Sequence, residues 1–565
     1  MRYSVLLGKV QGVDFSVKEA DTSLLLARAG FLRHTEDASV SLLPLGTRVL
    51  RRMESILESV LDKRGAQPIE LPQLVRSQSL FTSGRYEIFD GDVLYFRNEK
   101  GEEFFQTGHY EENVIDFLKT FAVAENEFPI CVYFYSNKIR PLWDQTGTAL
   151  AAREYRALNI FSAHRNMIEL NDFLPMLSAA FCRILNGWGI QVIYTESELH
   201  HSFGEKAFAL AADMDGKGSD RFFFCSKCGY MARSHMAKSA HSSHVEELKP
   251  AQKIRIPKSC NTYEKLAEYL GVPDYAIIKC ALFRTEKSFV MTVCRGDYIV
   301  SKEKLGHLSG GTYLRAATPT EAALFFPKGG FLSPIGLDSD DRVHVIVDES
   351  VVHGSNFVLG LNEEDFVLQN ANFGVDFEGN ETADISVVKE GDLCIQCGEP
   401  LQLRKESEVL RLVKTGDEYS KRMGFYATVR KKRQPVCLGS YTVDLMRLFF
   451  ITADKARDRY GFGWPHGLEP FLVYLFNDGR TAEARELTEL IYQSLPDEIL
   501  LDDRVLSAME KLQTARLTGI PYAVIVDDAL LKKRRVRLWS RRTGRKREYA
   551  IDLLLKKFKN GNRTF

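Results

Sequence analysis

The sequence predicts a multidomain protein of α+β and α/β domains, in which one domain is inserted into another. The chain has 565 residues, enough for roughly three or four domains of ~100–200 residues each. Two Cys-x-x-Cys pairs, Cys225/Cys228 and Cys394/Cys397, lie far apart in it. Two thiolate pairs at this spacing complete a tetrahedral zinc site. If both pairs bind one metal ion, the segment between them begins and ends at that ion. An inserted domain begins and ends at one place in its host domain in the same way.

The residues before the first cysteine pair combine helix and strand patterns. Apolar residues recur at helical spacing over 48–61 and predict an amphipathic helix. Apolar runs on both sides of the turn at 98–101 predict a hairpin. A second helix is expected over 111–121 and a buried strand over 130–135. This mixture is typical of an α+β domain.

The later parts of the chain show two further units. Between the cysteine pairs we expect a helix over 263–270 and strands over 276–283, 288–294 and 343–347. After the Pro-containing segment 464–470, a strand, a helix, an apolar strand and a basic hairpin indicate a small α/β domain. The predicted domains are a discontinuous host domain (1–245 and 391–466), an inserted domain (246–390) and a C-terminal domain (467–565).

The composition excludes several classes of protein. Lys plus Arg and Asp plus Glu number 75 each, so no global charge attracts a polyanion and a nucleic-acid site must be a local patch. The 10 cysteines fit a metal site and buried thiols in a reducing compartment better than a secreted disulfide framework. We see no signal-peptide pattern, and no run reaches the ~18 apolar residues of a membrane span. We therefore expect a cytoplasmic protein with no membrane partner.

The four paired cysteines are expected to form a closed structural zinc site, with no ligand position left for catalysis. The alternative is two independent thiol pairs that hold no metal. Histidines gather near the first pair, but their spacing fits no common metal motif. We interpret them as loop and surface residues: His200, His201, His235, His241 and His244.

The C-terminal domain ends in a strongly basic hairpin with its turn at Thr543-Gly544. Alternate side chains of a strand share a face, so this hairpin can present a row of cations to a phosphate backbone. A solvated edge hairpin is the alternative, because Lys and Arg also protect edge strands. The predicted nucleic-acid contacts are Arg534, Arg535, Arg537, Arg541, Arg542, Arg545, Lys546 and Arg547.

Short motifs follow one another along nearly the whole chain. They are Arg28-Ala-Gly-Phe-Leu-Arg33, Leu43-Pro-Leu-Gly-Thr-Arg-Val-Leu50, Ser83-Gly-Arg85, Cys228-Gly-Tyr-Met-Ala232, Trp464-Pro, Leu501-Asp-Asp-Arg504 and Gly519-Ile-Pro521. This ordered set resembles bacterial-type prolyl-tRNA synthetases, which are class II aminoacyl-tRNA synthetases. The resemblance implies an antiparallel sheet of six or seven strands with flanking helices, an inserted editing-like domain and a C-terminal anticodon-binding-like domain.

The resemblance also implies a chemistry and partners. ATP with Mg²⁺ is the family's cofactor, tRNA is its partner, and motif 1 (here 43–50) builds a homodimer. Proline attacks the α-phosphate of ATP, and the prolyl group then passes to the tRNA. Such catalysis is mostly positioning and charge stabilisation, so it depends on a few residues at fixed places.

The nucleotide motifs deviate from the family pattern. Motif 2 (Phe-Arg-x-Glu) appears as Ile139-Arg140-Pro141-Leu142, which keeps the α-phosphate arginine, Arg140, and loses the glutamate. Motif 3 (Gly-x-Gly-x-x-Arg) appears as Thr442-Val-Asp-Leu-Met-Arg447, which keeps the γ-phosphate arginine and loses both glycines. Asp444 puts an anion where the triphosphate should rest. At ~4 Å and an effective dielectric near 20, two like charges repel by about 4 kcal/mol.

The substrate motifs deviate as well. Thr-His-Glu appears as His109-Tyr110-Glu111. At the position where the family has the acid that meets the proline amine, this chain has Ala207. Arg411 occupies part of the family's Gly-His pair. The resemblance therefore gives Arg140, Arg447 and Glu111 as retained catalytic positions and places His109 and Arg411 in the substrate pocket.

The inserted domain keeps more of its pattern. Lys279 matches the family's editing lysine, and Gly330-Phe-Leu-Ser-Pro334 matches the loop that binds the aminoacyl group, with Gly330 and Pro334 as its ends. Without the resemblance, Lys279 would be interpreted as a surface lysine on a strand. Residual hydrolysis of mischarged tRNA stays open.

Features that serve dimerisation and tRNA contact persist, whereas those that serve ATP and proline have decayed. We therefore predict a dimeric, tRNA-binding family member whose proline adenylation is weak or lost, with a regulatory or residual editing role and an intact synthetase as one conceivable partner. A working but divergent proline–tRNA ligase is the first alternative. An adenylating enzyme for another carboxylate is the second.

Overall fold

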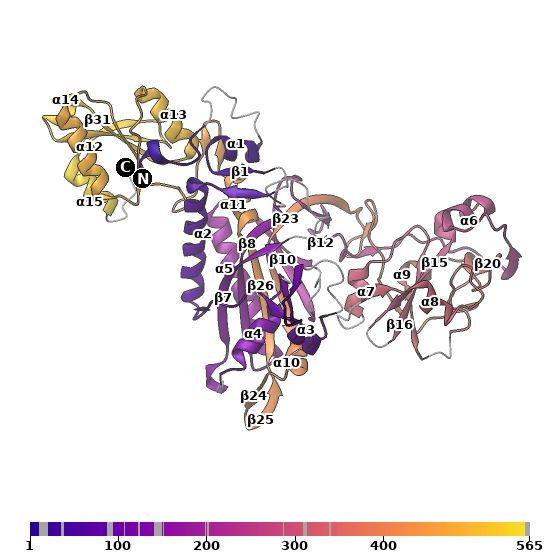
Figure 1. Ribbon diagram of the computed structural model, residues 1–565. Coiled ribbons are helices and arrows are strands. Elements are labelled where there is room, and N and C mark those ends of the chain that lie inside the picture. Colours follow the sequence, from indigo (N-terminus) through magenta and orange to yellow (C-terminus); the bar gives the residue numbers. More distant parts are fainter. Residues whose placement is uncertain are drawn as a thin grey trace.

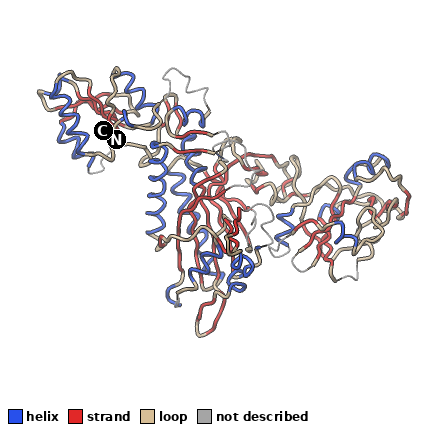
Figure 2. Tube along the Cα trace, in the orientation of Figure 1, coloured by secondary structure: helices blue, strands red, loops and turns tan. Residues whose placement is uncertain are grey.

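The computed structural model describes residues 1–10, 21–35, 39–86, 94–106, 108–121, 125–139, 150, 152–197, 199, 203–285, 288–308, 314–337 and 341–559. Figure 1 shows three bodies: a central sheet with its helices, an inserted domain that projects to one side, and a C-terminal domain at the opposite end. In the tube view the strands of the central body run side by side between flanking helices (Figure 2). Within the described ranges, no helix has the length and apolar character needed to cross a membrane.

The central body is built on a sheet that has nine strands in the described part of the chain, in the order β10-β9-β12-β11-β23-β26-β8-β7-β3. Neighbours are antiparallel except for the β9–β12 and β3–β7 pairs. The sheet is wider than the six or seven strands expected, because the short strands β3, β11 and β12 add to it. The bounds are β3 (Gln67–Pro68), β7 (Ile130–Ile139), β8 (Glu154–His164), β9 (Val192–Ser197), β10 (Lys206–Ala212), β11 (Asp220–Phe224), β12 (Met231–Arg233), β23 (Gln402–Gly416) and β26 (Cys437–Asp444).

Helices cover both faces of this sheet. Helices α2 (Pro44–Asp62), α5 (Met167–Gly187) and α11 (Leu445–Lys455) contribute to one hydrophobic core. Helices α4 (Glu111–Leu118) and α10 (Glu418–Met423) contribute to a second. The amphipathic helix predicted over 48–61 is confirmed and begins earlier, at Pro44, whose fixed φ suits the first helical turn. The smaller elements are α1 (Thr22–Arg28), α3 (Ser77–Ser83), β1 (Leu32–His34), β2 (Val40–Leu42), β4 (Val75–Arg76), β5 (Leu94–Arg97), β6 (Glu103–Gln106), β24 (Tyr426–Val429), β25 (Lys432–Pro435), β27 (Arg457–Asp458) and β28 (Gly461–Phe462).

The inserted domain has its own core and two sheets, of order β17-β15-β16-β18-β21 and β14-β20-β19. Short strands β13 (Ser239–Ala240) and β22 (Leu393–Cys394) pair where the chain enters and leaves it. The remaining bounds are β14 (Gln252–Arg255), β15 (Ile278–Arg284), β16 (Phe289–Arg295), β17 (Arg315–Ala316), β18 (Val343–Asp348), β19 (Phe357–Gly360), β20 (Phe366–Ala371), β21 (Glu381–Ala383), α6 (Tyr263–Leu270), α7 (Lys302–Leu308), α8 (Pro319–Ala323) and α9 (Glu349–Val352).

The C-terminal domain is an α/β unit with a sheet of order β30-β29-β31-β32-β33. The chain start is attached to it, since Arg2 bridges to Leu501 and the Met1 amino group donates to the Ile499 carbonyl over 2.9 Å. The chain start and the described end of the chain, at residue 559, therefore both lie in this body (Figure 1). The bounds are β29 (Val473–Asn477), β30 (Ile499–Leu501), β31 (Tyr522–Val526), β32 (Arg535–Ser540), β33 (Lys546–Ala550), α12 (Ala482–Ser494), α13 (Ala508–Thr518), α14 (Asp528–Leu531) and α15 (Ile551–Lys559).

Candidate functional site

A buried network of charges lies where helix α11 meets strands β11 and β23. Arg447 in α11 is 8% exposed, and its Nη1 lies 2.9 Å from Oδ2 of Asp220. The same nitrogen donates to the Glu408 carbonyl over 2.9 Å, and Nε donates to the Leu150 carbonyl over 3.1 Å. The guanidinium that the sequence assigned to the γ-phosphate is therefore engaged with groups of the protein itself.

Two further arginines share the acids of this network. Arg233 reaches Oε2 of Glu408 at 3.0 Å and Oδ1 of Asp220 at 3.3 Å. Arg411 donates from Nε to Oε1 of Glu408 over 2.8 Å. The resemblance placed Arg411 in the substrate pocket, and the structure places it in this network. We name the set formed by Asp220, Arg233, Glu408, Arg411, Asp444 and Arg447 the arginine–acid network.

Asp444 joins the network from the end of strand β26. Its Oδ1 accepts the backbone N–H of Arg447 over 2.9 Å, and its Oδ2 lies 3.8 Å from Arg447 Nε. Asp444 is thus the N-cap of helix α11. Free N–H groups and the helix dipole make a helix N-terminus a ready anion site. Here a carboxylate of the chain already occupies that position.

Lys138 is a buried cation that the sequence analysis missed. It lies in strand β7, is 7% exposed, and donates from Nζ to Thr442 Oγ1 over 3.2 Å. Burial lowers the pKa of Lys138 to about 8, opposed by the negative charges of Glu111 and Asp444 and aided by the positive charge of Arg411. A lysine on the buried face of a central strand is the signal that could have found it, because Lys138 shares its face of the strand with the buried residues Phe134 and Ser136.

A second buried charge cluster surrounds Arg85. This arginine is fully buried and donates from Nε to Oε1 of Glu112 over 2.8 Å, while its Nη2 lies 3.6 Å from Oε2 of Glu111. Burial alone would lower the pKa of Arg85, but the carboxylates beside it raise that pKa above its ordinary value. Glu111 is therefore an ion-pair partner in the protein interior.

The other residues predicted for activation differ in what the structure says of them. His109 is half-buried between β6 and α4. Ala207 in β10 is fully buried and pairs in register with Val413 of β23. Arg140 lies outside the described residues, as do Pro141 and Leu142, because the described part of β7 ends at Ile139.

Replacing Lys138 by methionine is expected to stabilise the protein at pH 7. Below pH 8 both folded and unfolded chains hold the Lys138 proton, so burial of the charge costs in full, about 3 kcal/mol. Between about pH 8 and 10.5 the folded chain loses the proton first, so wild-type stability rises with pH. Thermal melting at pH 7, 8.5 and 10 measures both effects.

The matched control for this prediction is Lys63→Met, at an exposed position after helix α2. We expect Lys138→Met to melt above wild type at pH 7 and to lose the rise between pH 8 and 10.5, whereas Lys63→Met follows wild type. Equal melting temperatures for wild type and Lys138→Met at pH 7 would contradict the assignment of Lys138 as a buried charge that its acidic neighbours compensate only in part.

Strand β15, which carries Lys279, is connected to the predicted loop through two aromatic side chains. Lys279 is half-buried in β15, and its neighbour Cys280 donates its backbone N–H to Tyr263 Oη over 3.2 Å. The Tyr263 ring lies 4.9 Å from that of Phe331, in the predicted loop. Gly330 has φ +82°, and a Cβ there would lie 2.3 Å from the Glu363 carbonyl oxygen, so the loop requires glycine.

The end of that loop is fixed by one asparagine. Asn362 accepts the backbone N–H of Ser333 over 2.7 Å and donates to the Ser333 carbonyl over 3.0 Å. Pro334 follows Ser333 and is buried. The structure therefore links the lysine strand and the glycine–proline loop through Tyr263 and Phe331.

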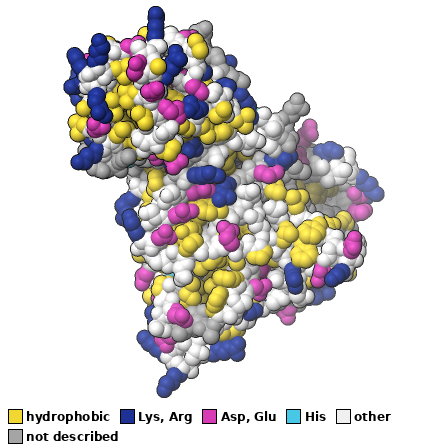
Figure 3. All heavy atoms as spheres, turned by 60° about the vertical axis from the view of Figure 1, so that its left-hand side comes forward, with side chains coloured by type: hydrophobic (Ala, Val, Ile, Leu, Met, Phe, Trp, Pro, Cys, Tyr) yellow, Lys and Arg dark blue, Asp and Glu magenta, His cyan; other side chains and the backbone are white. Residues whose placement is uncertain are grey.

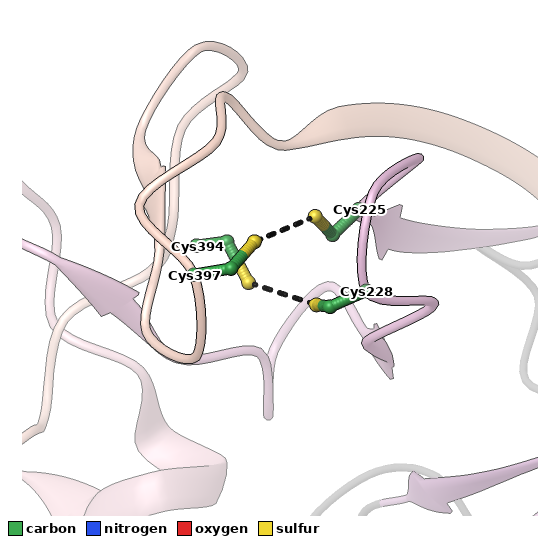
Figure 4. A group of neighbouring side chains, drawn as sticks. All are labelled: Cys225, Cys228, Cys394 and Cys397. Carbon is green, nitrogen blue, oxygen red and sulfur yellow. Dashed lines mark hydrogen bonds between the residues drawn. The ribbon is translucent and has the colours of Figure 1, made fainter.

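The four cysteines of the two Cys-x-x-Cys pairs converge on one point (Figure 4). Their Sγ atoms all lie within 4.8 Å of one another, with 3.4 Å between Cys225 and Cys397 and 3.6 Å between Cys228 and Cys394. Zinc–sulfur bonds of ~2.3 Å in a tetrahedron place sulfurs ~3.8 Å apart. The donor set and its geometry fit one tetrahedral ion shared by both pairs.

The predicted basic hairpin is formed by strands β32 and β33, which pair antiparallel. Three of its arginines form ion pairs within the protein. Arg541 pairs with Asp458 at 2.8 Å, Arg537 with Asp527 at 3.3 Å and Arg535 with Glu548 at 3.6 Å. The exposed cations of the predicted set are Arg534, Arg542, Arg545, Lys546 and Arg547. In Figure 3 the uppermost body, which is the C-terminal domain, carries Lys and Arg side chains along its outer rim.

Comparison with known proteins matches two of the three bodies to described domain families. A family model described as an aminoacyl-tRNA editing domain matches residues 257–377. A model described as an anticodon binding domain matches residues 471–561. These matches fall in the inserted body and the C-terminal body.

Relatives match along the whole chain. The chain is 32% identical over 550 residues to a proline–tRNA ligase of Thermotoga sp. (strain RQ2), covering 95% of this chain and 92% of the relative. It is 29% identical over 553 residues to the proline–tRNA ligase of Halothermothrix orenii, covering 96% of each. The prolyl-tRNA synthetase of Cryptosporidium parvum, solved with L-proline and AMP, is similar in fold, with a TM-score of 0.53 at 10% identity over 100% of this chain and 79% of that one. The chain therefore belongs to the prolyl-tRNA synthetase family, with that family's class II fold, editing domain and anticodon-binding domain.

Proposed function

We propose that this chain is a tRNA-binding family member in which ATP-dependent activation of proline is weak or lost. The observation that carries the proposal is the state of Arg447, whose guanidinium lies in buried contact with Asp220 and the Glu408 carbonyl. A phosphate that used Arg447 would have to displace these groups. Leaving buried carboxylates unpaired costs several kcal/mol.

The charge around Arg447 supports the same proposal. Asp444 caps helix α11 and points a carboxylate at the position where the phosphates of a nucleotide would meet the helix N-terminus. The arginines of the network are matched by Asp220, Glu408 and Asp444, so the network itself carries no net positive charge that would attract a triphosphate. Nucleotide binding would therefore have to overcome both desolvation and repulsion.

The tRNA-binding part of the proposal rests on the anticodon-binding domain and on its exposed cations. Arg542, Arg545, Lys546 and Arg547 are exposed, and no ion pair holds them among the described residues. Such residues are available to phosphates. The bound partner that we propose is tRNA.

Replacing Arg545, Lys546 and Arg547 together by alanine is expected to weaken tRNA binding. Each lost phosphate contact lowers the slope of log affinity against log salt by about 0.7–0.9, so the slope should fall by about 2–3. Filter binding at 50–300 mM salt measures both quantities. Binding that does not respond to salt would rule out the phosphate contacts.

The matched control for this triple variant is alanine at Arg430, Lys431 and Lys432. These exposed cations lie at the turn of the β24–β25 hairpin, at the far end of the central body from the C-terminal domain (Figure 1). The control removes the same charge, so equal weakening by both variants would show a general charge effect and contradict a site on the β32–β33 hairpin.

We also propose a homodimer, as expected from motif 1. The apolar stripe of helix α2 is mostly buried in the core of its own body. Large apolar side chains remain exposed on α3 and β5, namely Phe81 (55%), Leu94 (59%), Tyr95 (66%) and Phe96 (46%). A second copy that covers some of them would remove exposed apolar surface from water.

The four cysteines are proposed to hold a structural Zn²⁺ ion. A Cys₄ set with tetrahedral spacing leaves no open position, so the ion would fasten the two ends of the inserted domain and take no part in catalysis. Two metal-free thiol pairs remain the alternative. Metal analysis of the purified chain distinguishes the two.

An assay of tRNA(Pro) charging tests the proposed function. We expect the protein to retain tRNA on a filter and to form no prolyl-tRNA under the same conditions. A working but divergent proline–tRNA ligase is favoured by the names of the relatives at 29–32% identity, and it predicts charging. An adenylating enzyme for another carboxylate predicts pyrophosphate exchange with an acid other than proline.

A further inference from the structure

A histidine and two aspartates meet where the chain enters the inserted domain. His241 follows strand β13 on the segment that leads into this domain. Asp348 ends strand β18, and Asp384 directly follows strand β21. β18 and β21 are parallel neighbours, with Asp348 opposite Ala383. Both aspartates therefore lie at the carboxyl ends of these two strands, at the same end of the sheet. One ligand atom from each of the three residues lies within 4.8 Å of the others.

His241 lies in a loop, as expected, but it is buried, which corrects its interpretation as a surface residue. The side chain packs edge-on against the Tyr298 ring at 5.0 Å and leaves only 9% of the residue exposed. The companion histidines His200 and His201 lie outside the described residues, and His235 is exposed. The sequence could not reveal this burial, because it depends on contacts with residues far along the chain, such as Tyr298 and Asp348.

Polar atoms of this cluster are left without partners. Both ring nitrogens of His241 and Oδ2 of Asp384 are buried and have no hydrogen-bond partner in the described residues. An unpaired buried polar group costs ~1–3 kcal/mol. One ring nitrogen of His241 lies within 4.8 Å of a carboxylate oxygen of each aspartate, and these open positions point to a ligand held between the three residues.

The carboxylates are already oriented by other groups. Asp348 accepts the backbone N–H of Ser350 over 3.0 Å on Oδ1 and that of Ile385 over 2.9 Å on Oδ2. Asp384 accepts Lys304 Nζ over 2.7 Å on Oδ1. Each oxygen keeps a second lone pair. Such outer contacts, which fix the direction of a ligand, are typical of metal sites.

The charges also favour a cation. Lys304 is the one cationic side chain that contacts either aspartate in the described structure, so one of the two negative charges stays uncompensated. The nearby Arg295 is bound to Asp297 and to the Ser242 carbonyl. Burial lowers the pKa of His241, although the carboxylates of Asp348 and Asp384 oppose the shift.

We propose that His241, Asp348 and Asp384 bind a divalent transition-metal ion, with Zn²⁺ as the probe. One imidazole and two carboxylates form a ligand set that zinc accepts, with a fourth position for water, and the imidazole disfavours Mg²⁺ and Ca²⁺. The ion would fasten the entering segment to the sheet of the inserted domain. β13 would then lie between two metal sites, since Ser239 also pairs with Cys394 of the cysteine site.

Metal counting tests the proposal directly. The full chain is loaded with Zn²⁺, desalted and analysed by mass spectrometry of the metal, and we expect two ions per chain. His241→Phe keeps a ring against Tyr298 and removes the nitrogens, so it should hold one ion, and Asp384→Asn should do the same. The matched control His344→Ala, at an exposed histidine of the same domain, should hold two.

A second readout separates the two sites. Cobalt bound by thiolates gives an intense charge-transfer absorption, whereas cobalt bound by imidazole and carboxylates does not. Cys225→Ser with Cys228→Ser should abolish the thiolate absorption and leave one ion, while His241→Phe should retain that absorption, which also reports that the variant is folded. One ion per chain in wild type, or two in His241→Phe or Asp384→Asn, would overturn the proposal. The test does not depend on whether the chain activates proline.

Discussion

Replacing Asp444 by glycine is expected to raise the affinity for Mg²⁺-ATP by at least tenfold. The substitution removes a carboxylate at the N-terminus of helix α11 and frees the first-turn N–H that Asp444 now caps. The repulsion it removes is about 4 kcal/mol at ~4 Å and an effective dielectric near 20, which corresponds to about a thousandfold in affinity. Pairing with Arg447 at 3.8 Å reduces this value, so we expect between tenfold and a thousandfold.

Calorimetric titration of wild type and variant measures this change. Asp527→Gly is the matched control, because Asp527 caps helix α14 in the C-terminal domain in the same way. It should leave the nucleotide affinity at the wild-type value. Equal affinities for wild type and Asp444→Gly would show that Asp444 does not face the nucleotide, and the electrostatic argument would fail.

Replacing Arg447 by methionine is expected to destabilise the central body by about 3–5 kcal/mol. Asp220 and the Glu408 carbonyl would stay buried after they lose the guanidinium between them. In scanning calorimetry the transition of the central body should move down by on the order of 10 °C. This loss of stability is larger than the loss expected from removing an arginine that is exposed in a substrate pocket.

Two variants sharpen this second prediction. Arg404→Met, on the same strand as Glu408, removes a half-exposed arginine that lies 4.0 Å from Glu406, and it should cost less than about 1 kcal/mol. Asp220→Asn combined with Arg447→Met should recover part of the loss, since the carboxylate that Arg447 contacted is then a neutral amide. A single variant Arg447→Met that melts with wild type would mean that Arg447 is free to serve a ligand.

The parts of the fold that local patterns control could be predicted from the sequence. Helix α2 follows from apolar spacing, α6 was predicted with the bounds that the structure shows, and the hairpin β5–β6 follows from its turn. The convergence of the cysteine pairs followed from metal chemistry, because the spacing of each pair is local. The width of the sheet did not follow, since β3 and β12 are short strands set by tertiary contacts.

The arginine–acid network could not be predicted in the same way. Arg447 and Asp220 are 227 residues apart, and Glu408 and Asp220 are 188 residues apart. No local spacing indicates such a pairing. Asp444 was noted as an anion in a nucleotide motif, but its role as a helix cap beside Arg447 is a property of the folded chain. Lys138 stands just before the motif 2 stretch 139–142 and outside its pattern, so no motif indicates that this lysine is buried.

ATP–pyrophosphate exchange with proline tests the central claim most directly, because it isolates the activation step from tRNA binding. The account predicts no proline-dependent exchange above the background without protein, in the same preparation that binds tRNA. Exchange that saturates with proline and requires Mg²⁺ would contradict it, and the chain would then be a working proline–tRNA ligase.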